Sequence, residues 1–174
     1  MSKIDKKLKF ISVNVVVLTV SDTRNLKNDT SGKFLINSIK KLGHKVINRE
    51  IVKDNLLNIK KFLKLWCKKK DTDIIIITGG TGLTKRDITT EAVTQLSDKV
   101  IDGFGELFRQ ISYDKIGSSA IQSRAIGAVI NGKYIFSLPG STGACKDAWN
   151  EILKYQLDSR HRPCNFIEII PRLS

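Results

Sequence analysis

The 174-residue sequence is poor in cysteine and histidine, and this scarcity argues against two kinds of stabilised site. Cys67, Cys145 and Cys164 are odd in number, widely spaced and form no C-x-x-C pair, so we expect no disulfide framework. His44 and His161 have no second histidine at ligand spacing, so we expect no zinc site. Cys67 and Cys145 fall on apolar faces of expected helices, which favours core thiols over nucleophiles.

The sequence also lacks any long apolar run. No stretch approaches the ~18 uninterrupted apolar residues of a membrane span, and residues 1–7 are charged without a signal-peptide core. We therefore expect a soluble, cytoplasmic protein with no membrane partner. With 41% hydrophobic residues, the chain predicts a single domain over residues 1–174, with 1–12 flexible and 158–174 a C-terminal extension.

Acidic residues are fewer than basic ones, 17 against 30, for a net charge of +13. Such an excess can serve a nucleic-acid surface or attract anionic small molecules. However, the lysines are scattered on expected helices that are also rich in Asn and Ile, and no ladder of interleaved aromatic residues accompanies them. A solvated basic face is the favoured interpretation, and we expect no nucleic-acid partner.

Apolar runs and helical patterns alternate along the first half of the chain. Strands are expected over 13–20, 44–52 and 73–77, and helices from Asp29 or Thr30 to Gly43 and over 55–70. This β-α-β-α-β order implies right-handed crossovers and a mostly parallel, doubly wound sheet. The predicted fold class is α/β.

The second half repeats the alternation with one insertion. Helical patterns cover 89–96 and 103–113, and residues 125–138 indicate a small hairpin that turns at Asn131-Gly132, a strong type I′ signal. The following strand runs into a second glycine-containing turn at 139–143, after which a helix is expected to bury Cys145, Ala148, Trp149 and Ile152.

The segment Thr78-Gly79-Gly80-Thr81-Gly82 is the most informative in the chain, because it directly follows four isoleucines. A glycine-rich turn exposes backbone N–H groups that can cradle phosphate oxygens, threonine hydroxyls add donors, and the nearby Asp87 can hold a divalent cation. A ligand that carries phosphate is therefore predicted. The segment matches neither common phosphate-binding motif, so a plain strand-to-helix turn is the alternative.

Two further loops are expected to face the same crevice, since the carboxyl ends of parallel strands meet at one sheet edge. They are the turn at 139–143 and the loop Ser21-Asp22-Thr23 after the first strand. Asp54 ends a strand and Asp87 follows the glycine turn, so both carboxylates can reach this edge. The alternative for each is a helix cap, before Asn55 and before Ile88-Thr89.

Several ordered motifs together carry a resemblance to a known family. In chain order they are Leu18-Thr19-Val20-Ser21, Asp29-Thr30-Ser31-Gly32, Ile51-Val52-Lys53-Asp54, Thr78 to Thr84 with Arg86-Asp87, Gly103-Phe104-Gly105-Glu106, Ser123-Arg124 and Leu138-Pro139-Gly140-Ser141-Thr142. They resemble the MoaB/Mog family of molybdenum cofactor biosynthesis, which includes molybdopterin adenylyltransferases. The tail over 156–166 is similar to the B-type branch.

The resemblance implies a three-layer α/β/α sandwich, a homotrimer or a hexamer, and transfer of AMP from ATP to molybdopterin with Mg²⁺, releasing pyrophosphate. Its catalytic carboxylates, which also hold Mg²⁺, carry over onto Asp54 and Asp87. Other proteins of the pathway are further partners that it suggests. The apolar character of Pro163-Cys164-Asn165-Phe166 favours an interface in the tail.

Substrate-binding residues carry over in three groups. Thr78, Gly79, Gly80, Thr81 and Gly82 are expected to hold an anionic part of the pterin or nucleotide, Ser123 and Arg124 the pterin side or a phosphate, and Pro139, Gly140 and Ser141 the nucleotide. Arg86 and Arg124 can instead form structural salt bridges, and Ser123 can cap or pack. Adenylylating members commonly continue the Pro-Gly turn with Asn-Pro, whereas Ser141-Thr142 stands here, so a noncatalytic molybdopterin-binding or carrier role is the alternative.

Overall fold

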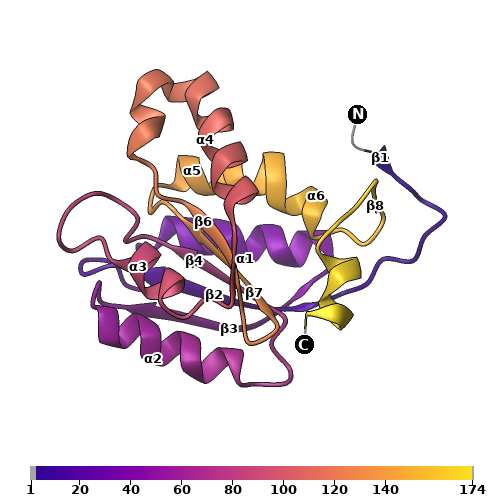
Figure 1. The fold of residues 1–174 in the computed structure, drawn as a ribbon, viewed down its shortest axis with the longest axis horizontal. Helices are drawn as coiled ribbons and strands as arrows, with labels where there is room; N and C mark the ends of the chain where they lie inside the picture. The colour runs from indigo at the N-terminus through magenta and orange to yellow at the C-terminus, as the bar shows by residue number, and fades with distance from the viewer. Residues whose placement is uncertain (1–2, 174) are drawn as a thin grey trace.

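A six-stranded sheet forms the centre of the fold (Figure 1). The computed structural model describes residues 3–173, so the parts of the predictions for 1–12 and 158–174 that concern residues 1, 2 and 174 lie outside it. The strand order is β3 (Lys45–Val52), β2 (Asn14–Val20), β4 (Ile74–Thr78), β7 (Lys133–Leu138), β6 (Ile126–Ile130) and β5 (Lys99–Ile101). β3, β2, β4 and β7 run parallel, and β6 is antiparallel to both of its neighbours.

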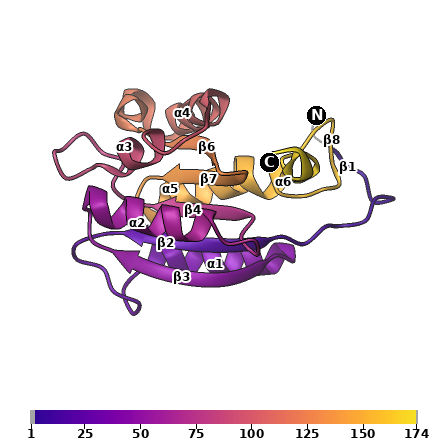
Figure 2. The same ribbon diagram turned by 60° about the horizontal axis from the view of Figure 1, so that its bottom comes forward.

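Helices cover both faces of this sheet (Figure 2), so the predicted three-layer α/β/α class is confirmed. One layer contains α1 (Thr30–Leu42), α4 (Asp102–Ile116) and α5 (Thr142–Asp147), which continues through the π-helical segment η2 (Ala148–Leu153) into α6 (Lys154–Gln156). The other layer contains α2 (Leu56–Cys67) and α3 (Thr89–Thr94).

Alternating side chains of the central strands supply both cores. In β4, Ile74 and Ile76 pack with the α1 side, whereas Ile75 and Ile77 pack with the α2 side, and all four are fully buried. A strand buried on both faces needs apolar residues at every position, which is why this isoleucine run forms the middle of the sheet. The parallel order places the ends of β2, β4 and β7 at one edge.

Both helical cysteines lie in these cores, as the sequence predicted. Cys67 and Cys145 are free thiols and buried, and burial raises the pKa of Cys67 to about 12 and that of Cys145 to about 11. Thiols that stay protonated at neutral pH are poor nucleophiles. Their role is packing.

The hairpin is confirmed, with positive φ angles at Asn131 (49°) and Gly132 (70°). Its strands β6 and β7 are integral to the main sheet, where the sequence suggested an insertion. The sheet also has an edge strand that the sequence did not predict, β5, whose residues 99–101 are largely exposed and too few to show an alternating pattern. Two 3₁₀ helices, η1 (Gly117–Gln122) and η3 (Ile167–Arg172), were likewise not predicted.

Residues 3–12 were expected to be flexible, but in the structure they lie along the C-terminal segment. β1 (Lys3–Ile4) pairs antiparallel with β8 (His161–Arg162). The hydroxyl of Ser159 donates to the Lys9 carbonyl (3.0 Å) and accepts from the Ile11 N–H (2.9 Å). The two terminal segments thus satisfy each other's backbone groups, a pairing that no local sequence pattern reveals.

Part of the tail over 163–166 packs against the chain's own core. The ring of Phe166 lies 4.8 Å from that of Tyr134 and 5.3 Å from that of Phe136. Asn165 is 1% exposed and its amide donates to the carbonyls of Ser159 and His161. Intramolecular packing therefore accounts for Asn165 and Phe166, whereas Pro163 and Cys164 are exposed.

His44 connects Leu157, which follows α6, to Val13, which precedes β2, and its burial makes stability depend on pH. Its buried ring accepts the Val13 N–H at Nδ1 (3.2 Å) and contacts the Leu157 carbonyl oxygen from Nε2 (2.9 Å), which fits a neutral ring with its proton on Nε2. Burial lowers the pKa of His44, partly opposed by the Leu157 carbonyl and by Asp158 and Asp73.

We predict that the contribution of His44 to stability is present above its unfolded pKa of about 6.5 and is lost as pH falls toward the lower folded pKa. The free energy of unfolding should decrease by up to about 1.4 kcal/mol per pH unit in this range. Urea denaturation at pH 7.0, 6.0 and 5.5 measures the slope. His44→Gln should be less stable but show a shallower slope, and equal slopes in both proteins would contradict the assignment.

Candidate functional site

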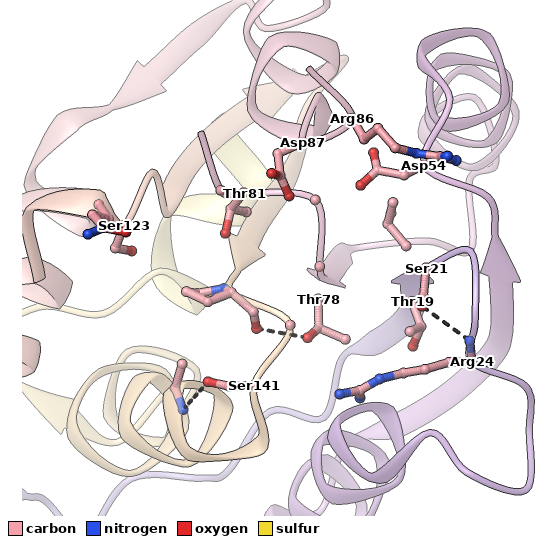
Figure 3. A pocket seen from close by; sticks show the side chains of 18 of the residues that line it. Thr19, Ser21, Arg24, Asp54, Thr78, Thr81, Arg86, Asp87, Ser123 and Ser141 are labelled. Carbon is pink, nitrogen blue, oxygen red and sulfur yellow. Dashed lines mark hydrogen bonds between the residues drawn. The ribbon is translucent and has the colours of Figure 1, made fainter. Parts of the chain in front are cut away.

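A cavity of about 760 Å³ opens where the ends of β2, β4 and β7 meet (Figure 3). Its walls come from the three predicted loops, from the segment after β3 and from α4 and η1. The lining residues include Thr19, Ser21, Asp22, Thr23, Arg24, Asp54, Thr78, Gly79, Gly80, Thr81, Gly82, Arg86, Asp87, Ser123, Pro139, Gly140 and Ser141. All of the sequence-predicted site residues except Arg124 therefore lie around one cavity.

The glycine turn after β4 depends on left-handed backbone at Gly79 (φ 105°) and Gly80 (φ 66°). A Cβ at Gly79 would overlap the Val20 carbonyl oxygen, so only glycine fits at this point. The Gly79 N–H donates to the Leu138 carbonyl (2.9 Å) and is therefore not free for a bound anion, the role that the sequence predicts for it. Gly79 therefore shapes the turn, and the Gly82 N–H is directed at the Asp87 carboxylate and helps to lower its pKa, which leaves Gly80 as the better candidate for a backbone donor to a ligand.

Thr78 also holds the site together from behind. Its buried hydroxyl donates to the Pro139 carbonyl (3.0 Å) and lies 3.2 Å from Cys145 Sγ, so it ties the two turns to each other. The turns approach so closely that a Cβ at Gly140 would lie 3.4 Å from Gly79 Cα. Ser141 caps α5 by accepting the Ala144 N–H (3.2 Å).

Asp54 is not the helix cap that the sequence left as an alternative, because Asn55 caps α2 by accepting from the N–H groups of Leu57 and Asn58. The Oδ1 atom of Asp54 is buried and has no hydrogen-bond partner in residues 3–173. Burial raises the pKa of Asp54, and the negative charges of Asp87 and Asp22 add to this effect. An unpaired carboxylate oxygen beside other carboxylates is a position that a cation would stabilise.

Asp87 does not cap α3 either, since Ile88 occupies the cap position. Its Oδ2 accepts from the N–H (3.0 Å) and the hydroxyl (2.6 Å) of Thr84, which closes the loop after the glycine turn. These hydrogen bonds lower the pKa of Asp87, and the one from the Thr84 hydroxyl has the largest effect. Asp87 is thus held as a carboxylate at the cavity wall.

The oxygen donors of this end of the cavity fit a magnesium ion. Asp54 and Asp87 face each other above the glycine turn in Figure 3. Over residues 3–173 no cluster of three or more Asp, Glu, His or Cys side chains suited to a metal occurs, so the protein offers fewer ligands than a closed site needs. Magnesium commonly takes one or two carboxylates and completes its shell with waters and substrate phosphates.

Arg124 does not line this cavity, contrary to the substrate-binding role expected for it. Its guanidinium donates from Nε to the Gly82 carbonyl (2.8 Å) and from Nη2 to the Asp87 carbonyl, and it pairs with Glu91. Arg124 therefore fastens the loop between Gly82 and Asp87, which is the structural alternative. Its neighbour Ser123 does reach the cavity edge.

Two arginines at the rim of the cavity differ in where their side chains point. Arg86 pairs with Asp22 across the cavity mouth and its side chain is 70% exposed, so it forms the surface salt bridge that the sequence allowed. Arg24 points into the cavity and was not singled out by the sequence analysis. The sequence likewise missed Phe108, Ser112, Ile116 and Gln122 in the far wall, which carry no local signal of a binding role.

No helix within residues 3–173 is both long and apolar enough to cross a membrane.

The site belongs to an α/β domain whose crevice lies at the carboxyl edge of a parallel sheet. This is the usual location for binding nucleotides and related anionic ligands.

Comparison with known families identifies this class. Residues 16–159 match the family described as a "probable molybdopterin binding domain", and the chain belongs to this MoaB/Mog family. A relative from Escherichia coli K12 named molybdenum cofactor biosynthesis protein B is 46% identical over 158 residues, which cover 91% of this chain and 93% of the relative. The protein of the same name from Bacillus cereus is 49% identical over 146 residues, 83% and 86% of the two chains.

Solved structures agree with this assignment. A crystal structure of molybdenum cofactor biosynthesis protein B has a TM-score of 0.85 and 44% identity, covering 94% of this chain and 96% of that one. The tungsten cofactor synthesizing protein MoaB from Pyrococcus furiosus has a TM-score of 0.74 and 35% identity, covering 82% and 91%. MogA shares the fold, with a TM-score of 0.78 at 21% identity over 92% of this chain and 99% of that chain.

Proposed function

We propose that this chain acts in molybdenum cofactor biosynthesis and transfers AMP from ATP to molybdopterin with the help of Mg²⁺. The observation that supports this most is the pairing of Asp54 and Asp87 at one end of a cavity whose floor is a glycine turn. Membership of the family indicates molybdopterin as a ligand, and the two carboxylates are suited to hold the metal.

In this reaction an oxygen of the terminal phosphate of molybdopterin attacks the α-phosphorus of ATP. A new P–O–P linkage forms, the bond between the α- and β-phosphates breaks, and pyrophosphate leaves. Transfer between two anions is chiefly a problem of positioning and charge neutralisation. Magnesium, held by Asp54 and Asp87, supplies positive charge beside the phosphates when it is bound.

The remaining residues bind and orient. The N–H group of Gly80 and the hydroxyl of Thr81 belong to the floor of the cavity and can donate to an anionic group, while the Gly82 N–H supports the Asp87 carboxylate. Pro139, Gly140 and Ser141 form the opposite wall for the nucleotide, and Ser123 closes the pterin side. Phe108 and Ile116 add apolar surface to the far wall, against which a flat ring of the pterin or the nucleotide can pack.

A direct assay tests the proposal. Purified protein is incubated with molybdopterin, ATP and Mg²⁺, and the adenylylated pterin and pyrophosphate are quantified; omitting the pterin or chelating the metal should abolish both products. Binding of molybdopterin without either product would instead support the noncatalytic carrier role. Ser141 is the residue that favours this alternative. Its hydroxyl caps α5, and serine has no amide that could both donate to and accept from a nucleotide, as the asparagine common in adenylylating members can.

We also propose that the chain assembles as a homotrimer or hexamer. Exposed apolar side chains gather on α4 and η1, among them Leu107 (42% exposed), Tyr113 (62%) and Ile121 (82%). We expect light scattering to give three or six times the monomer mass and Ile121→Lys to shift the protein toward monomer. Leu57→Lys, at a 75% exposed position on the other layer, is the matched control. A monomeric wild type across micromolar concentrations contradicts the proposal.

A further inference from the structure

One positive charge in the cavity is not accounted for by the residues considered so far. Asp29 is 1% exposed at the start of α1 and is paired with two arginines, Arg24 at Oδ1 (3.4 Å) and Arg49 at Oδ2 (3.0 Å). Two guanidinium groups share a single carboxylate, so the cluster keeps one net positive charge. Thr19 and the Gly32 N–H complete the hydrogen bonds of Asp29.

The unbalanced charge faces the cavity through Arg24. Arg24 lines the 760 Å³ cavity, whereas Arg49 does not. Of the Arg24 donors, Nη1 is used by Asp29 and by the Ser31 hydroxyl (2.8 Å), and Nε and Nη2 make no hydrogen bond with any residue in 3–173. The side chain therefore retains both charge and donors for a ligand.

Arg24 is also fixed in place. Ser31, which accepts from its Nη1, donates its own hydroxyl to the Gly140 carbonyl (2.8 Å), so the guanidinium is tied to the second turn. A side chain already held in one orientation loses little conformational entropy when it binds a ligand. In Figure 3 it points toward Ser141, on the side of the cavity away from Asp54 and Asp87.

From this geometry we infer that Arg24 forms an anion subsite, separate from the carboxylate end, which binds a phosphate group of a substrate. A fixed guanidinium with free donors suits a tetrahedral oxyanion, and the distribution of charge separates the two ends of the cavity. The subsite receives a phosphate of either the nucleotide or the pterin, and to this extent it rests on the proposed function. It orients one phosphate-bearing ligand along the cavity.

Equilibrium binding tests the subsite without catalysis. Isothermal titration calorimetry measures the affinity of the wild type and of Arg24→Gln for three ligands. These are inorganic pyrophosphate, ATP without pterin, and molybdopterin without ATP. We expect Arg24→Gln to weaken the binding of pyrophosphate, and of at least one of the two substrates, about 10- to 100-fold. The substrate that loses affinity identifies the source of the phosphate. Lys27→Gln, an exposed lysine of the same loop, removes the same charge and should change nothing.

Changes below threefold for all three ligands, a wild type that binds none of them, or equal losses in Lys27→Gln would overturn the inference. If Arg24→Gln fails to fold, Arg24→Lys keeps the charge but loses the planar fork, and wild-type affinity in that variant also overturns it. A protein that shows Arg24-dependent binding but transfers no AMP would refute the proposed function and leave the subsite standing.

Discussion

Replacing Asp87 by asparagine is expected to lower the rate of AMP transfer about 10²-fold or more, equivalent to about 2.7 kcal/mol of transition-state stabilisation. Asparagine keeps the size of the side chain and an oxygen that can accept from Thr84, so the loop should stay closed. The carboxylate charge that holds magnesium is lost. Single-turnover rates of adenylylated pterin formation, together with titration of molybdopterin, separate this loss from a loss of binding.

Asp71→Asn is the matched control, because Asp71 is exposed and precedes β4 at the opposite end of the sheet from the cavity. It should leave the rate unchanged. If Asp87→Asn turns over at nearly the wild-type rate, the carboxylate serves only to close its loop with Thr84, and the metal-holding role is wrong.

Gly80→Val is expected to impair both folding and binding. A Cβ at this position would overlap the Thr89 hydroxyl oxygen and lie 2.9 Å from Asp54 Oδ2, and the φ of 66° is one that β-branched residues avoid. The strained backbone alone costs roughly 1–3 kcal/mol of stability. Displacement of Asp54 should weaken molybdopterin binding in the presence of Mg²⁺ by about 10-fold or more.

Gly103→Ala provides the comparison for this second prediction. Gly103 lies in α4, and a Cβ there would meet no atom within 4 Å, so alanine should leave stability equal or slightly improved. Chemical denaturation and titration of both variants measure the two effects. A folded Gly80→Val protein with unchanged affinity for molybdopterin would remove the glycine turn from the binding site.

The elements of the fold that the sequence predicted are those with redundant signals. Ile74 to Ile77 are apolar at every position and followed by glycines, so both the buried strand and the turn could be read directly. The hairpin could be predicted because Asn131-Gly132 has a specific backbone preference. By contrast β5 is short and exposed, and its place in the sheet is set by pairing with β6, which is distant in sequence.

For the site, the sequence could predict which loops meet but not where their polar groups point. Sheet topology brings Asp54 and Asp87 to one edge, whatever the details of packing. The direction of Arg124 depends on carbonyls of the loop after the glycine turn, and the partner of the Gly79 N–H is on β7. The role of Arg24 could not be predicted, because it depends on Asp29 being buried and paired with Arg49 as well.

The close approach of the two turns has a consequence for how such a sequence can change over evolution. Thr78, which precedes the glycine turn, links it to the second turn by donating to the Pro139 carbonyl, and a Cβ at Gly140 would be in ordinary van der Waals contact with Gly79 Cα. A substitution at position 78 therefore affects both turns, because the new residue must still donate to the Pro139 carbonyl. Selection should therefore retain a hydroxyl at position 78, and a graft of the second turn from a distant relative should be tolerated only when it keeps a carbonyl within reach of that hydroxyl.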